Sequence, residues 1–275
     1  MISEGKIASK DGTQLYYRRH TPSGPPKGRL MIVHGYGEHS GRYLELLEAL
    51  AAAGIDALAP DLRGHGRSDG ARAHIMRFGE YLEDCRATYH LLAGGSGEKV
   101  IVLGHSMGGL VATCFVLAEP QVCKALILSG PLFKRALKSN PLKIAAGHLF
   151  SKVVPKLALP SGITGDMVTH DPKEIEAYNN DPLLISNVRA RWFTEMETAL
   201  AGVPGRIGAL NVPLIVFHGE LDAIASIEQA RLVFDRAGSK DKKFVALPGM
   251  RHEPLHEVER ARIVKDIVAW TVERA

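Results

Sequence analysis

Short apolar runs that alternate with longer amphipathic stretches constrain the fold of this chain more than any other feature. Runs such as RLMIV, IDALAP, VIVLG and KALILS have the length and the β-branched content of strands that are buried on both faces. Between them, residues 43–53, 77–92 and 107–118 have the periodicity of helices. Because parallel strands are joined by helical crossovers, we expect a mostly parallel α/β sheet with helices on both faces.

The two ends of the chain modify this pattern. Residues 3–9 and 13–19 flank Asp11-Gly12, a short turn that predicts an antiparallel hairpin. From residue 212 the alternation returns, with strands PLIVFHG and KKFVAL and helices predicted at 226–237 and 256–273.

The middle of the chain breaks the alternation. Residues 131–205 contain several prolines and short helical patterns but no convincing strand. One sheet with one insertion explains this better than two tandem domains. We therefore expect a core made of residues 1–130 and 206–275, with residues 131–205 as a helical lid insertion.

Composition excludes several classes of protein. A chain of 275 residues with 45% hydrophobic and 23% charged residues is an ordinary globular protein that needs no disulfide or metal. The net charge of +4 is small and its Lys and Arg residues are scattered, so nucleic acid is not an expected partner. No apolar run has the length of a signal peptide or of a transmembrane helix, which favours a cytoplasmic location. Cys85, Cys114 and Cys123 have no metal-site spacing, and we expect them to be buried thiols.

The segment VIVLGHSMGGLVATC carries the strongest chemical signal. It places Ser106 between an apolar strand and an amphipathic helix, with Gly104 and Gly108 two residues away on either side. A serine at such a junction sits on a sharp turn that projects its hydroxyl, and the glycines make room for that turn. The alternative is a serine that merely caps the helix. We interpret Ser106 as a nucleophile.

A serine nucleophile needs a base, and the base needs an orienting acid. In this architecture both follow the serine in chain order, on loops after later strands. Asp222 comes just after PLIVFHG, and His252 lies between KKFVAL and the final helix. Two glutamates compete less well with Asp222, because Glu220 is too close to the strand and Glu228 lies inside the next helix.

One other histidine competes with His252. His256 lies four residues further on, and we expect it to face solvent at the start of the final helix.

Acyl transfer also needs two N–H donors for the oxyanion. The N–H of Met107 follows the nucleophile directly. The second donor is expected from the glycine-containing loop at residues 34–37, where the N–H of Tyr36 is our choice over an ordinary strand-end turn. His34 is expected to form structural hydrogen bonds rather than to act in catalysis.

With these residues in place, the chain resembles the monoacylglycerol lipase and lysophospholipase group of the α/β-hydrolases. The likeness is carried by HGYGEHSGRY, PDLRGHGRSDG, GHSMGG and the HGELD and MRHEPLHE loops. It extends from about residue 12 to the end and is weakest across 131–205. The nucleophile, acid, base and oxyanion donors of the group correspond to the residues already chosen: Ser106, Asp222, His252, Tyr36 and Met107.

The resemblance also implies an eight-stranded α/β-hydrolase fold with a lid and no cofactor. It makes Asp61, Arg63 and His65 structural residues of the loops under the site. The sequence DPLL at 181–184 resembles the exit of the group's lid.

A stripe of apolar residues runs through the first part of the insertion: Leu142, Ile144, Ala145, Leu149, Phe150, Val153, Val154 and Leu157. Lysines are interleaved with it, at positions 138, 143, 152 and 156. Such a helix could lie in a membrane interface or roof an acyl tunnel, or it could pack on the core with its lysines solvated. Pro141 and Pro155 are expected to interrupt the stripe.

The function expected from these features is hydrolysis of a single-chain lipid ester, most simply a monoacylglycerol, through an acyl-enzyme on Ser106. A lysophospholipase and a short-chain carboxylesterase are alternatives. A carbon–carbon hydrolase, a peptidase or an acyltransferase could also use the same triad. A non-catalytic binding protein of this fold is a remote alternative. Contact of the lid with a membrane surface is an added hypothesis, and the oligomeric state stays open.

Overall fold

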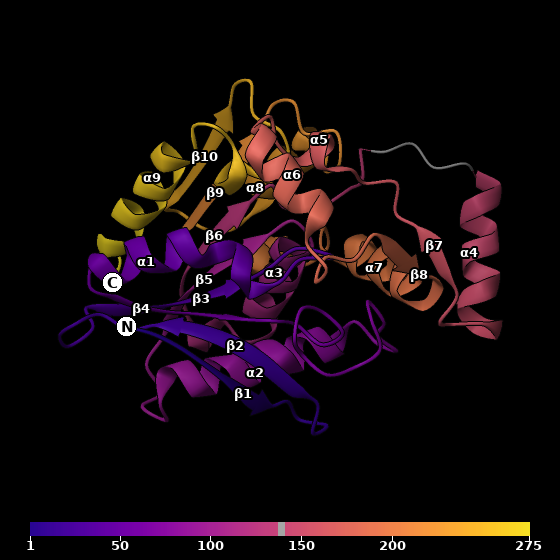
Figure 1. Ribbon diagram of the computed structural model, residues 1–275. Helices are drawn as coiled ribbons and strands as arrows, with labels where there is room; N and C mark the ends of the chain where they lie inside the picture. The colour runs from indigo at the N-terminus through magenta and orange to yellow at the C-terminus, as the bar shows by residue number, and fades with distance from the viewer. Residues whose placement is uncertain (137–140) are drawn as a thin grey trace.

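The computed structural model describes residues 1–136 and 141–275, and the side chains of residues 141–143 lie outside the description. The described residues form an eight-stranded sheet in the order β1-β2-β4-β3-β5-β6-β9-β10 (Figure 1). Its strands are β1 (Ile2–Ala8), β2 (Gln14–His20), β3 (Gly28–Val33), β4 (Ile55–Pro60), β5 (Val100–His105), β6 (Cys123–Ser129), β9 (Leu214–Gly219) and β10 (Lys242–Leu247).

The strands pair as the sequence predicts. β1 and β2 form the antiparallel hairpin, and β2 is antiparallel to β4. From β4 through β10 every neighbouring pair is parallel. The turn at Asp11-Gly12 works because Gly12 has a φ of 87°, and because the Asp11 carboxylate accepts a hydrogen bond from the N–H of Thr13 at 3.1 Å. The expected α/β-hydrolase fold with a mostly parallel sheet is confirmed.

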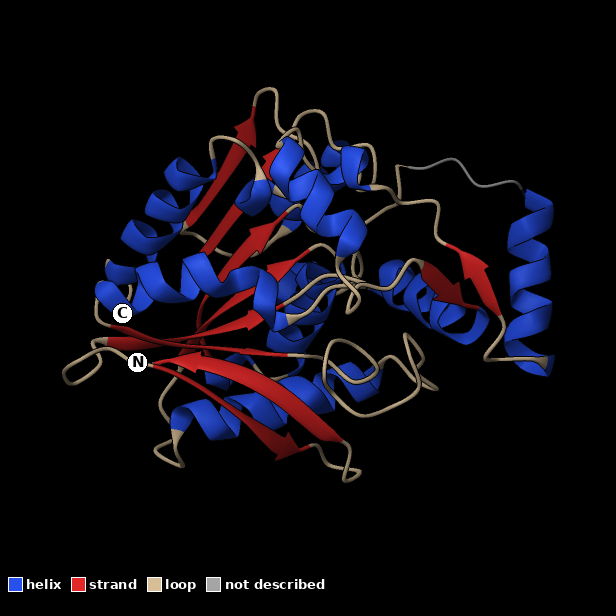
Figure 2. Cartoon of the chain, in the orientation of Figure 1, coloured by secondary structure: helices blue, strands red, loops and turns tan. Residues whose placement is uncertain are grey.

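Helices cover both faces of the sheet (Figure 2). The core helices are α1 (Leu44–Ala52), α2 (Gly79–Ala93), α3 (Met107–Ala118), α8 (Ile227–Arg236) and α9 (Arg260–Val272). Alternate residues of the central strands divide between two apolar clusters: Val100 and Val102 pack with α2, α3 and α8, whereas Ile101 and Leu103 pack with α1 and α9. This alternation is the consequence of burying one strand on both faces.

One expected helix has a different character. We expected residues 107–118 to be amphipathic, but Met107 through Val116 are all buried. The helix lies between the sheet on one side and α2 with part of the insertion on the other, so it has no solvent face.

The insertion contributes the elements that lie outside the large sheet. They are α4 (Pro141–Val153), β7 (Ala158–Pro160), α5 (Gly165–Val168), α6 (Pro172–Asn180), β8 (Asn187–Arg189) and α7 (Ala190–Gly202). β7 and β8 form a small antiparallel ladder, although no strand was expected in this region. We keep the predicted limits of the insertion, 131–205, as a proposal.

The apolar stripe of α4 faces outward rather than packing on the core. Leu149 is 60% exposed and Val153 is 69% exposed. α4 contacts α7 through another face, where Ser151 hydrogen-bonds Thr194 at 2.6 Å. The helix begins at Pro141, so this proline starts the stripe and does not interrupt it. The helix ends two residues before Pro155, which separates Leu157 from the rest of the stripe, as expected. Of the residues in the stripe and its lysines, Leu142, Lys138 and Lys143 lie outside the described residues or side chains.

Two further expectations concern cysteines and membrane spans. Cys85, Cys114 and Cys123 are free thiols and all three are buried. Among the described residues, no helix combines the length and the apolar character needed to cross a bilayer.

Candidate active site

Ser106 occupies the sharp turn between β5 and α3. Its φ of 51° and ψ of −118° are strained for a residue with a side chain. The flanking glycines are required by close contacts, because a Cβ on Gly104 would lie 2.4 Å from the carbonyl oxygen of Gly108. A Cβ on Gly108 would lie 2.1 Å from the carbonyl oxygen of Val33. The turn therefore cannot form with larger residues at these two positions.

The three residues predicted to form a triad lie within hydrogen-bonding distance in the required order. Ser106 Oγ is 2.8 Å from His252 Nε2, and His252 Nδ1 is 2.7 Å from Asp222 Oδ2. They follow β5, β9 and β10, three strands whose carboxyl ends share one edge of the sheet. Neither of the two competing glutamates contacts His252 among the described residues. Glu220 is exposed, and Glu228, in the first turn of α8, accepts a hydrogen bond from the preceding Ser226.

Asp222 is held in its ionised form by several donors. Its Oδ1 accepts the N–H groups of Ile224 and Ala225 at 2.8 and 2.9 Å. His218, a residue of β9 that the sequence analysis did not single out, places Nε2 3.1 Å from Oδ2. Burial favours the neutral acid, but the neighbouring charges and hydrogen bonds of His252 and His218 outweigh it and lower the pKa of Asp222.

The same two effects act on His252, and there they shift the pKa in the opposite direction. Burial disfavours its imidazolium, but the charge and hydrogen bond of Asp222 win, so the pKa of His252 lies above the ordinary value for histidine. A base that gains stability on protonation is suited to accept a proton from a neighbouring hydroxyl.

The predicted oxyanion donors lie beside the serine. Met107 is the first residue of α3, so its N–H has no partner within the helix. Among the described residues, the N–H of Tyr36 also has no hydrogen-bond acceptor. Gly35 brings this loop against the serine, because a Cβ at Gly35 would lie 3.2 Å from Ser106 Cβ. Both N–H groups are therefore free to bind an anion that forms at this point.

Ser106 opens into a cavity of about 320 Å³ between the core and the insertion. The walls are mainly apolar, and the larger contributors are Leu132, Val188, Trp192, Phe193, Met196 and Ile224. Tyr36 packs on Trp192 with ring centroids 4.1 Å apart, which links the loop of the predicted oxyanion donor to α7. The charged residues of the wall, Arg135 and Glu197, form an ion pair with each other at 3.1 Å.

Comparison with known proteins agrees with this geometry. Residues 24–259 match a family model described as serine aminopeptidase, S33. A monoacylglycerol lipase of Mycolicibacterium smegmatis is 33% identical over 98% of this chain and 97% of its own length. This chain belongs to the monoacylglycerol lipase group of the α/β-hydrolases. It is a hydrolase of the lipase and esterase type.

Two further proteins are similar to this chain over most of their length. A Bacillus subtilis phospholipase is 32% identical over 90% of this chain and 95% of its own length. The crystal structure of a monoacylglycerol lipase from Paleococcus ferrophilus is 28% identical, with a TM-score of 0.85 over 95% of this chain and 99% of that one.

Asp61, Arg63 and His65 were expected to have structural roles because of the resemblance to this group. All three are buried in hydrogen-bond networks. Asp61 accepts the N–H groups of Ser40 and Arg67 at 2.6 and 2.8 Å. Arg63 pairs with the buried Asp84 at 2.6 Å, and His65 Nδ1 donates to the carbonyl of Arg63. These contacts tie the loops under the site together.

His34 and the DPLL segment also form hydrogen bonds in this region. His34 Nε2 accepts the N–H of Leu62 at 2.8 Å, a structural hydrogen bond as expected. The DPLL segment is joined to the core by Asp181, whose carboxylate lies 2.8 Å from His39 Nε2.

One expectation about the hydrolase site is wrong. His256 does not face solvent: it is buried, and its Nε2 hydrogen-bonds the carbonyl of Arg42 at 2.9 Å. The reason is a 3₁₀ turn at Pro254–His256, which turns this side chain inward before α9 begins at Arg260. His256 is thus a buried neighbour of the site and not a surface residue.

Proposed function

We propose that this hydrolase cleaves the ester of a single-chain lipid, most simply a monoacylglycerol, through an acyl-enzyme on Ser106. The observation that carries this proposal is the position of Ser106 Oγ, 2.8 Å from His252 Nε2 and at the wall of a mainly apolar cavity. The hydrogen-bonded serine supplies the nucleophile, and the cavity supplies a site for an acyl chain.

The proposed reaction uses the five residues in distinct roles. Ser106 Oγ attacks the ester carbonyl while its proton moves to His252 Nε2, and Asp222 stabilises the imidazolium. The N–H groups of Tyr36 and Met107 bind the oxyanion. The imidazolium then protonates the leaving alcohol, and water activated by His252 releases the fatty acid.

The wall of the cavity favours a lipid over a peptide. An aminopeptidase must bind the ammonium group of its substrate, which calls for a carboxylate that is free of other partners. Glu197 is the carboxylate of the cavity wall, but it pairs with Arg135 at 3.1 Å and with His148 at 2.9 Å. The apolar walls and this neutralised ion pair support an uncharged acyl chain instead.

The exposed stripe on α4 supports a further part of the proposal. Leu149 and Val153 face outward on α4 together with the exposed Lys152, and the exposed Lys156 follows the end of the helix. This segment therefore presents both apolar and basic groups. A helix of this kind binds at an anionic lipid surface. We propose that α4 brings the enzyme to the membrane or micelle that holds its substrate.

Relative kcat/KM across monoacylglycerols, lysophospholipids and soluble esters of increasing chain length tests the substrate assignment. We expect long-chain monoacylglycerol to be the best substrate. We also expect the Ser106→Ala variant to remain folded and to lose roughly 10⁴-fold or more in kcat. A clear preference for a water-soluble short ester would refute the lipid assignment. Normal activity in the Ser106→Ala variant would refute the nucleophile.

A further inference from the structure

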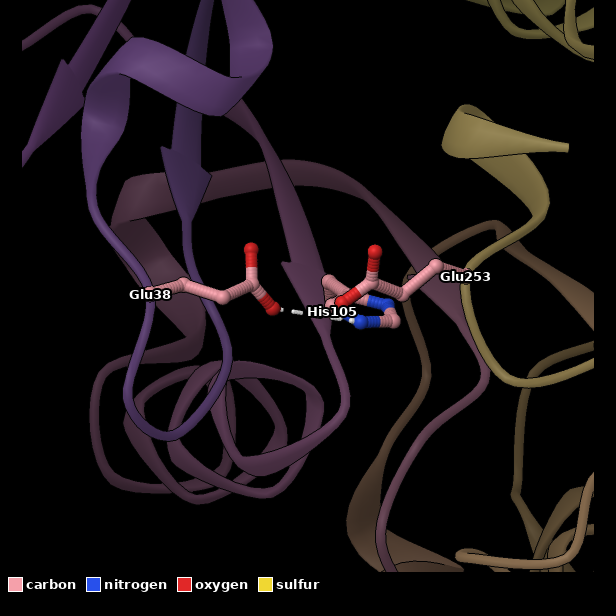
Figure 3. A group of neighbouring side chains, drawn as sticks. All are labelled: Glu38, His105 and Glu253. Atoms are coloured by element: carbon pink, nitrogen blue, oxygen red, sulfur yellow. Dashed lines mark ion pairs between the residues drawn. The ribbon is translucent and has the colours of Figure 1, made fainter. Parts of the chain in front are cut away.

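Three buried side chains form a polar cluster next to the proposed base, and none of them takes part in the mechanism above. Glu38 comes from the loop after β3, His105 ends β5 and Glu253 follows His252 (Figure 3). His105 Nε2 lies 3.3 Å from Glu38 Oε1. The ring of His105 packs against the ring of His252, with centroids 5.1 Å apart. The cluster is therefore in contact with the base.

Two acidic residues of the cluster are arranged around one arginine. Arg42 contacts Glu253 through its guanidinium and lies 3.9 Å from Glu38 Oε2, while Tyr43 donates a hydrogen bond to that oxygen at 3.0 Å. Burial opposes the ionisation of Glu253, but the charge of Arg42 outweighs it and lowers the pKa of Glu253. Burial lowers the pKa of His105, which keeps this ring neutral near neutral pH. Two acidic side chains therefore share one guanidinium.

The same three side chains could be considered for a metal ion, since their ligand atoms lie within 4.8 Å of one another. The surrounding charges argue against it. Arg42 already occupies Glu253 Oε2 and lies near Glu38, and a divalent cation would be repelled by this buried guanidinium. The acidic side chains are better matched to the imidazolium that forms on the neighbouring ring of His252.

We propose that Glu38 and Glu253 are positioning residues that strengthen His252 as the general base by placing buried negative charge beside its ring. The inference rests on the proposed function. When Ser106 Oγ bonds to the carbonyl carbon, its O–H bond breaks and the proton moves to His252 Nε2, while the carbonyl electron pair becomes the oxyanion. The imidazolium formed in this step is stabilised by Asp222 at Nδ1 and by the cluster beside the ring.

Several other titratable and charged groups near His252 also influence its pKa. Burial has the largest effect on the pKa of His252 and lowers it, and Asp222 has the next largest effect and raises it. Glu253 and Glu38 raise this pKa further by smaller amounts. The titratable and charged groups that face His252 or its partners are Asp222, His218, His105, Glu38, Arg42, Glu253 and His256.

The pH profile of kcat/KM with p-nitrophenyl butyrate, from about pH 5 to about pH 9, tests the inference. Glu253→Gln removes the charge with little change in shape, and Glu253→Asp keeps the charge. Glu259→Gln is the matched control, because Glu259 is exposed and its contact is with Arg262 on the surface. On the acidic side of the profile, kcat/KM falls as His252 becomes protonated. We expect Glu253→Gln to shift the midpoint of this acid limb to lower pH by roughly one unit, and to lower kcat several-fold at alkaline pH. Glu253→Asp and the control should keep the wild-type midpoint.

Glu38→Gln provides a second variant in case Glu253→Gln fails to fold, and it should move the limb in the same direction. An unchanged midpoint with a uniform loss of activity at every pH would overturn the inference, since it indicates a structural role alone. So would a stoichiometric metal ion in the wild-type protein that is lost in Glu38→Gln. A wild-type enzyme without esterase activity would instead refute the proposed function.

Discussion

At the scale of single residues, Ser106 combines a proposed chemical role with backbone strain. A residue with a side chain at φ 51° and ψ −118° costs about 1–3 kcal/mol of folding free energy, and only glycine adopts these angles freely. Neighbouring contacts hold the strained turn, including the hydrogen bond from the N–H of Ser106 to the carbonyl of Ser129 at 3.0 Å. The backbone conformation that projects the Ser106 hydroxyl therefore lowers the folding stability of the protein.

This strain predicts that Ser106→Gly is more stable than Ser106→Ala. Both variants lose the hydroxyl, but only glycine relieves the strain. The flexibility of glycine in the unfolded chain offsets part of the gain, so we expect a difference of about 1 kcal/mol. Urea unfolding of the two variants measures it. A Ser106→Gly variant that is less stable than Ser106→Ala would show that the turn is not strained.

Asp222 controls both the orientation and the pKa of His252, so its replacement has a predicted effect on rate and on pH dependence. The neutral imidazole is the active base, and its pKa is raised, so wild-type activity falls as the pH drops through a value above about 6.5. Asp222→Asn should lower kcat by about 10⁴-fold and move this limb to lower pH. Asp235→Asn, an exposed position on α8, is the control. A loss under tenfold would contradict the role of Asp222.

Some residues of the site could be predicted from the sequence and others could not. The positions of Ser106, Asp222 and His252 followed from strand ends in a fixed chain order. His218 and Glu253 were missed, because their contacts depend on how separate loops approach one another. The only available signal was their place inside the HGELD and MRHEPLHE loops.

At the scale of elements, α4 shows how one helix can pack through one face and leave another exposed. Its contact with α7 includes the Ser151–Thr194 hydrogen bond and the approach of Gly147 to the ring of Phe193. Leu149 and Val153 are left on the outside. In Figure 1, α4 stands on the far side of α7 from the sheet.

The exposed stripe predicts binding to lipid. The double variant Leu149→Ser/Val153→Ser should bind anionic vesicles at least about tenfold more weakly, because each side chain contributes on the order of 1 kcal/mol on burial. Its activity on a soluble ester should be unchanged. Leu232→Ser, at an exposed position of α8 in the core, is the matched control. Equal vesicle binding by wild type and the double variant, measured by sedimentation, would contradict the proposed role of α4.

Elements with a clear period could be predicted from sequence, and short ones could not. The core strands and helices were found because buried strands are continuous apolar runs and most core helices repeat every three to four residues. β7 and β8 have three residues each, too few to show an alternation. Their pairing joins segments that are separated by two helices, a tertiary contact that local sequence does not encode.

At the scale of the whole molecule, the sheet and the insertion contribute different groups to the site. The sheet brings the loops after β5, β9 and β10 to one edge and holds the proposed triad. The insertion supplies most of the apolar cavity wall, chiefly from α7. Spacing arguments located the first part, whereas no pattern in residues 131–205 indicated which side chains would face Ser106.

This division has a consequence for specificity. Because the proposed catalytic residues and the cavity wall belong to different parts, substitutions in α7 should alter acyl-chain preference without moving the triad. Chain selection and ester cleavage are therefore expected to vary separately in this enzyme.

The most direct test of the central claim is to trap the intermediate. An acid-quenched reaction with a long-chain monoacylglycerol, followed by peptide mass spectrometry, locates the acyl group. The proposal predicts one fatty-acyl adduct on the peptide that contains Ser106, and none in Ser106→Ala. Hydrolysis of monoacylglycerol that persists in Ser106→Ala, or an acyl group found on another residue, would contradict it.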